Sequence, residues 1–126
     1  MAIWTIKDFV EASGKCPIWD WLSSEIPPEA KAHIDARILQ MMNLLHWSEK
    51  WISAYKNSDK ILELRIPFQK VQYRPLGIYQ PGRTLILLEG AIEKDGKLTT
   101  GALGRAESRA ALLDREPNHV REHRFN

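Results

Sequence analysis

The sequence lacks the residues that would place it among disulfide-rich, zinc-binding or membrane-spanning proteins. It has a single cysteine, Cys16, which cannot form an intramolecular disulfide, and no Cys/His group has the spacing of a zinc site. No apolar run approaches the roughly 20 residues that a membrane helix needs, and the first residues lack the order of a signal peptide. We therefore expect a soluble, cytoplasmic protein with no metal, no other cofactor and no membrane partner.

The chain does have enough apolar residues for one core. Hydrophobic residues make up 44% of its 126 residues, which suits one folded domain; we expect this domain to span 1–117, followed by a basic, flexible tail at 118–126. The net charge is only +2, but eight of the nine arginines follow residue 60. Guanidinium groups pair well with phosphate oxygens, so this half is the better candidate for nucleic-acid contact, with a solvated charged surface as the alternative.

The first half of the chain has the apolar spacing of helices, after one short strand. The β-branched and aromatic run at 3–6 predicts the strand. Pro17 suits the first turn of a short helix that ends near residue 24, and an apolar spacing of three to four residues predicts a second helix over 28–46. The segment 50–55 is expected to add one further helical turn.

From residue 61 the apolar residues alternate with a period of two, which is typical of strands. The alternation changes phase at Arg74–Pro75, where we expect a β-bulge that leaves Arg74 on the open face of the sheet. Pro81–Gly82 predicts a type II turn, and the spacing over 103–113 predicts a helix that ends before Pro117. The predicted fold class is therefore α+β, with two N-terminal helices packed on a small antiparallel sheet and a C-terminal helix.

The two N-terminal helices are expected to cover one face of a contiguous antiparallel sheet over 61–92. The opposite face should carry Arg65 and Arg74, because a guanidinium without a partner is too costly to bury. The packed face should include Leu64, Tyr73, Leu76 and Ile78.

Several short motifs together carry a resemblance to a known family. They are GKCPIWDWL at 14–22, IPPEAK at 26–31, LELRI at 62–66, VQYR at 71–74 and LLEGAIEK at 87–94. In this order and spacing they resemble the phage-derived, HigB-like branch of the RelE/ParE toxin superfamily. The resemblance covers about residues 1–94, and the order of predicted elements agrees with the fold of that family.

The resemblance implies the toxin component of a type II toxin–antitoxin system, with one of two activities. RelE- and HigB-like members cleave mRNA on the ribosome by attack of a ribose 2′-hydroxyl on the adjacent phosphate, whereas ParE-like members poison DNA gyrase. Cleavage requires a base, cations that stabilise the phosphorane, and an acid for the leaving oxygen. An mRNA endonuclease is our main hypothesis, so the expected partners are mRNA on the ribosome and a cognate antitoxin of the helix-turn-helix kind.

The resemblance also implies catalytic residues. Arg74 matches a family arginine that contacts the scissile phosphate, and Arg65 matches the arginine that ends the second-strand motif. Lys94 falls where the family has a basic residue after its last long strand, and His119 is a further candidate because some HigB-like enzymes use a histidine near the C-terminus. The candidate RNA-binding residues, taken from outward strand positions and from turns, are Lys70, Gln72, Arg83 and Lys97.

Two departures from the family pattern leave the general base unassigned. RelE-type members carry lysines on the second strand, where this chain has Ile61 and Glu63, and a Lys-Lys pair of HigB-like relatives is replaced by Glu93-Lys94. A structural ion pair with Glu63 is an equal alternative for Arg65. A gyrase poison, a catalytically degenerate member of the fold and a non-catalytic RNA- or protein-binding module therefore stay open as alternatives.

Overall fold

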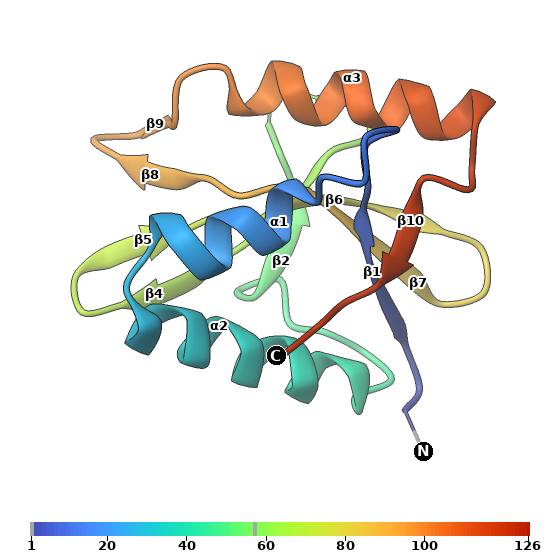
Figure 1. Cartoon of the computed structure of the whole chain (residues 1–126). Helices are drawn as coiled ribbons and strands as arrows, with labels where there is room; N and C mark the ends of the chain where they lie inside the picture. Colours follow the sequence, from blue (N-terminus) through green and yellow to red (C-terminus); the bar gives the residue numbers. More distant parts are fainter. Residues whose placement is uncertain (1, 57) are drawn as a thin grey trace.

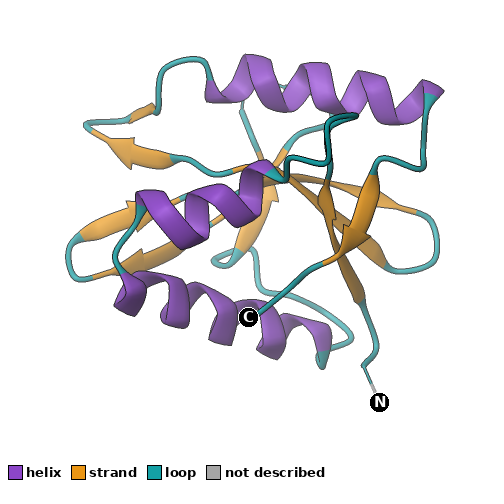
Figure 2. Cartoon of the chain, viewed as in Figure 1, coloured by secondary structure: helices purple, strands orange, loops and turns teal. Residues whose placement is uncertain are grey.

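The chain folds into three layers, with a six-stranded sheet between two sets of helices (Figures 1 and 2). The structure is a computed structural model that describes residues 2–56 and 58–126. One side of this sheet carries α1 (Pro17–Asp20), the π-helical turn η1 (Trp21–Glu25) and α2 (Pro28–Met42). The other side carries α3 (Ala102–Arg115), so the described residues form two apolar clusters, one on each side of the sheet.

The six-stranded sheet is mixed: β1 runs parallel to β7, whereas the other pairs of neighbouring strands in this sheet are antiparallel. Its order is β10 (Val120–Glu122), β1 (Thr5–Phe9), β7 (Thr84–Glu89), β6 (Leu76–Gln80), β3 (Leu62–Leu64) and β2 (Ile52–Ala54). A second, antiparallel sheet has the order β4 (Ile66–Phe68), β5 (Val71–Tyr73), β8 (Ile92–Lys94) and β9 (Lys97–Leu98).

The continuous apolar run of β7 follows from its central position between two helical layers. Leu85 and Leu87 pack in the cluster under α1 and α2, whereas Ile86 and Leu88 pack in the cluster under α3. Each is at most 1% exposed, and burying a side chain of this size contributes about 1.5–3 kcal/mol. The α3 layer therefore depends on the same strand as the N-terminal helices.

Three strands bend at the same level and pass from one sheet into the other. The breaks lie at Arg65, at Arg74–Pro75 and at Gly90–Ala91. They are joined through the backbone, since the Arg74 amide donates to the Ala91 carbonyl at 2.8 Å and the Leu64 amide donates to the Pro75 carbonyl at 2.8 Å. Gly90 is required at its bend, because a Cβ there would overlap the Trp21 ring.

Helix α2 begins as the sequence predicts but ends at Met42, four residues earlier than expected. Its carbonyl groups at this end find other partners, which stops the helix. The Trp47 indole N–H donates to the Met41 carbonyl at 2.7 Å, and the Ile3 and Trp4 amides donate to the Met42 carbonyl. The following segment 50–55, expected as a helical turn, contains strand β2 instead.

The predicted fold class is wrong. The described chain has three α-helices and ten strands in two sheets, with α3 covering the side of the larger sheet that was expected to be open. The error has a physical cause: pairs of strands such as β3–β4 and β5–β6 read as single strands, because a bend leaves the period of two intact on either side.

The predicted packed face is also wrong. Leu64 and Tyr73 do pack under α1 and α2, but Leu76 and Ile78 pack under α3. The phase change at Arg74–Pro75 is real, yet it marks the passage from β5 into β6 and the other sheet. The register shift within the β6–β7 pair lies further on, between Leu76 and Gly77.

Residues 118–126, expected as a flexible tail, are part of the fold. They contribute β10, which pairs with β1, and they place His123 at 8% exposure in the interior. The polar composition of this segment resembles that of a solvated terminus, whereas His123 is paired with Asp8 and Asp35 in the interior.

Candidate functional site

A hollow of about 170 Å³ lies where the two sheets meet, and Arg65 is the predicted site residue that lines it. Its walls come from the end of β2, the β3–β4 bend and the β8–β9 hairpin. The lining residues are Ala54, Tyr55, Lys56, Glu63, Arg65, Glu93, Gly96 and Leu98. Two cations, two carboxylates and a phenol hydroxyl therefore share one small concave surface.

Arg74 lies beside this hollow, but it is buried and not exposed as expected. Only 8% of the residue is accessible, and the carboxylate within ion-pair distance among the described residues is Glu93, with Oε1 3.8 Å from Nε. This distance is too long for a hydrogen bond. Nε and Nη1 of Arg74 are both buried without a hydrogen-bond partner in the described part of the chain. Tyr73 packs against the Trp21 ring of η1, and strand alternation turns Arg74 to the other side of the strand.

Arg65 combines the two roles that the sequence left open. It forms an ion pair with Glu63, whose Oε1 lies 3.2 Å from Nε and 3.1 Å from Nη2. Glu63 is buried, whereas the Arg65 side chain is 43% exposed, so the guanidinium is held on one side and still faces solvent on the other. A buried carboxylate thus fixes the orientation of an accessible arginine.

The β8–β9 hairpin brings further predicted residues to the same part of the molecule. Lys94 lies opposite Lys97 in the ladder, and both side chains are exposed. Gln72 is half-buried and lies opposite Glu93 in the β5–β8 pair. Lys70 is exposed in the turn that joins β4 to β5.

Two predicted residues lie elsewhere. Arg83 is exposed in the β6–β7 turn, on the opposite side of the molecule from the β8–β9 hairpin (Figure 1). His119 follows α3, with its Nδ1 3.0 Å from the Val10 carbonyl and its ring stacked near Phe9. The structure therefore groups Arg65, Arg74, Lys94 and Lys97 but not Arg83 or His119.

Sequence reasoning missed Tyr55 and Lys56. Both follow β2, and the Tyr55 amide donates to the Ile61 carbonyl at 2.8 Å, which brings them beside the start of β3. The residues that precede them, ISA at 52–54, have the composition of a short strand, but the segment 50–55 was expected to form a helical turn. Reading this segment as a strand next to 61–66 would have placed Tyr55 near Glu63.

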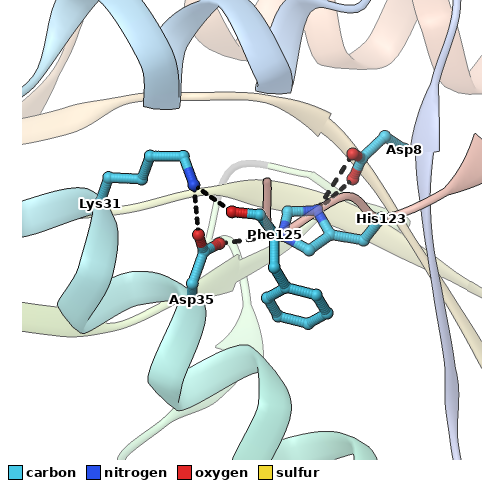
Figure 3. A network of polar contacts seen from close by, with 5 residues as sticks. All are labelled: Asp8, Lys31, Asp35, His123 and Phe125. Atoms are coloured by element: carbon cyan, nitrogen blue, oxygen red, sulfur yellow. Dashed lines mark hydrogen bonds and ion pairs between the residues drawn. The ribbon is translucent and has the colours of Figure 1, made fainter. Parts of the chain in front are cut away.

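A second missed feature is a buried polar network around His123 (Figure 3). Its Nδ1 lies 2.9 and 3.0 Å from the two carboxylate oxygens of Asp8, and its Nε2 lies 3.0 Å from Oδ1 of Asp35. The Lys31 ammonium group donates to Asp35 at 2.6 Å and to the Phe125 carbonyl at 2.7 Å. Burial by itself lowers the pKa of His123, but the hydrogen bonds and charges of Asp35 and Asp8 outweigh it and raise the pKa from 6.5 to about 9.

This network is structural. Both ring nitrogens of His123 face carboxylate oxygens, so the charged imidazolium, which donates from both, fits the geometry. The His123 side chain is 1% exposed and that of Asp8 is fully buried, which excludes contact with a substrate. The network joins β1, α2 and the C-terminal segment.

A cleft of about 490 Å³ lies between α1–η1 and α3 and is electrostatically balanced. Glu89 forms ion pairs with Arg105 and Arg109 of α3, and so ties this helix to β7. The charged residues that line the cleft are Lys15, Arg105 and Arg109 together with Asp20, Glu25 and Glu89. The hollow at Arg65 is balanced in the same way, so the preference for that hollow rests on the predicted residue Arg65 that lines it and not on net charge.

The described residues contain no group of three or more His, Cys, Asp or Glu residues that could hold a metal ion. None of the described helices is long and apolar enough to cross a membrane. Comparisons with protein-family models, with curated proteins and with solved structures found no match to this chain.

Proposed function

We propose that the chain is the toxin of a type II toxin–antitoxin pair, that it cleaves mRNA on the ribosome, and that the hollow at Arg65 is its reactive site. The observation that carries the proposal is Arg74, a buried arginine with two guanidinium nitrogens that lack an acceptor. A buried donor without a partner costs about 1–3 kcal/mol, so native proteins seldom keep one without a reason. A phosphate bound in the hollow would offset the unpaired positive charge of Arg74 at longer range, because the two buried nitrogens do not themselves open into the hollow.

The surrounding groups support phosphodiester chemistry without a metal. Arg65 presents an accessible guanidinium at the hollow, and Arg74 adds a second positive charge behind Glu93. Two cations at this point favour the dianionic phosphorane over the monoanionic substrate, because the interaction strengthens as charge builds. Lys94 and Lys97 add positive charge on the adjoining hairpin.

Glu93 is the carboxylate best suited to act as the base. Glu63 already accepts from Arg65, whereas the interaction of Glu93 with Arg74 is longer than a hydrogen bond. In the proposed step the 2′-oxygen bonds to phosphorus and its proton passes to Glu93, while the P–O5′ bond breaks. The Tyr55 hydroxyl donates a proton to the leaving O5′, and the products are a 2′,3′-cyclic phosphate and a 5′-hydroxyl end.

The test is expression of the chain in a bacterium without its antitoxin. Wild type should arrest growth and produce cuts in mRNA, and Glu93→Gln should relieve both at equal expression. Arg83→Gln, on the other side of the molecule, is the matched control and should stay toxic. Healthy growth with intact messages would refute the proposal, and DNA damage with intact messages would assign the chain to the gyrase poisons.

A further inference from the structure

A second hollow, of about 350 Å³, continues from the first. The two hollows share four lining residues: Tyr55, Lys56, Gly96 and Leu98. From there the second hollow extends along the 97–101 segment to the first turn of α3. Together they form one groove, with Arg65 at one end and Gly104 at the other.

The charge of the second hollow differs from that of the first hollow and from that of the cleft between α1–η1 and α3. Its charged lining residues are Lys56 and Lys97, and no carboxylate lines it. The first hollow contains Glu63 and Glu93, and the cleft under α3 contains three carboxylates. A concave surface with positive charge alone concentrates anions, since low-dielectric walls focus the field.

The remaining walls leave room for a ligand to approach the backbone. The hollow is lined by glycines at 96, 101 and 104, and the space beside a Cβ at Gly96 or Gly104 is empty. Glycine at such positions permits close approach of a phosphate group to main-chain atoms. Thr99 and Thr100 supply the polar side chains of this part.

We infer that this second hollow, with Lys56 and Lys97, binds the phosphate next to the scissile one, so that RNA runs through the groove from Arg65 toward α3. The inference rests on the proposed function, because it takes the first hollow as the cleavage site. It adds a substrate requirement: the RNA must extend beyond the cleaved bond by at least one phosphate. Lys56 stands where the two hollows join and therefore contributes to both.

The experiment measures binding separately from cleavage. A short 2′-O-methyl oligonucleotide lacks the attacking hydroxyl, and its affinity can be followed by fluorescence anisotropy over a range of KCl concentrations. Each phosphate contact contributes about 0.7 to the slope of log K against log salt for a single strand. Lys56→Gln and Lys97→Gln should each lower the slope by about this amount and weaken binding at low salt. Lys50→Gln removes an exposed lysine that lines neither hollow and should change nothing.

The outcomes separate this inference from the proposed function. Wild-type slope and affinity in both Lys56→Gln and Lys97→Gln would overturn the phosphate subsite. Displacement of the oligonucleotide by polyglutamate, with the same dependence on the two lysines, would also overturn it in favour of an acidic protein segment. If wild type leaves the matching 2′-hydroxyl RNA intact on ribosomes but keeps the lysine-dependent slope, the nuclease fails, and what stands is a phosphate-binding hollow with no scissile bond beside it.

Discussion

Replacing His123 by glutamine should remove a specific pH dependence of stability. The imidazolium lies between Asp8 and Asp35 in the interior, and its pKa is raised from 6.5 to about 9. Because the folded-state pKa lies above the unfolded one, the stabilisation is fully present below pH 6.5 and is lost as the pH rises through 9. At about 1.4 kcal/mol per pKa unit, the loss over this window is about 3 kcal/mol.

The surroundings of His123 make the variant informative below this window as well. Lys31 of α2 pairs with Asp35, and Arg121 of β10 lies opposite Asp8 in the β1–β10 ladder. Glutamine leaves both carboxylates buried with one positive partner fewer, so the unfolding free energy at pH 6 should fall by about 3–5 kcal/mol. Above pH 9 wild type and variant should approach each other.

Urea unfolding followed by tryptophan fluorescence from pH 6 to pH 10 measures this difference. His119→Gln is the matched control, since that ring is partly exposed beside Val10 and should change the unfolding free energy by less than about 1 kcal/mol. If the wild-type and His123→Gln curves run parallel across the whole range, His123 is not charged in the fold and the reasoning is refuted.

Three further predictions concern single buried or open positions. Arg74→Met keeps the side-chain volume and removes the unpaired donors, so the free energy of unfolding in urea should stay the same or rise by about 1 kcal/mol. The rate of mRNA cleavage on ribosomes should fall about a hundredfold, whereas a clear loss of stability would show that Arg74 is structural. Gly90→Ala should lower the unfolding free energy by about 2–4 kcal/mol because the new Cβ would overlap Trp21. Gly104→Ala, which has open space beside it in α3, should raise the unfolding free energy by about 0.5–1 kcal/mol, and thermal unfolding of the two variants measures the difference. Arg65→Gln should reduce cleavage about a hundredfold and Arg83→Gln less than about twofold, and equal effects would move the site away from the hollow.

The sequence predicted the local elements better than their arrangement. Helix α2 was recognised from its spacing, and the break at Arg74–Pro75 was found where the chain does change sheets. A phase change cannot distinguish a bulge from a strand that leaves the sheet, because both shift the alternation by one residue. The parallel pairing of β1 with β7 joins segments about 80 residues apart, and no local pattern encodes it.

Local sequence patterns indicated the candidate site only in part, because burial and pairing depend on contacts between distant segments. Arg65, indicated by the resemblance, and Lys97, indicated by turn geometry, line the first and the second hollow respectively. The burial of Arg74 could not be predicted locally, because the residue lies where β5 passes into β6, beside Ala91 and Glu93 from a later part of the chain. Whether a polar side chain is paired inside, as with His123, likewise depends on partners on other elements.

The three aligned bends separate the six-stranded sheet, which is packed between the helices, from the four-stranded sheet, whose hairpin turns are exposed. The strand turns at Gln69–Lys70 and at Asp95–Gly96 lie beyond the bends, have positive φ angles and are exposed. Insertions at these turns would lengthen the β4–β5 and β8–β9 hairpins outward, and no residue of the six-stranded sheet would change its partner. The reach and charge of these two hairpins, and with them the choice of ligand, can therefore be changed at little cost to folding.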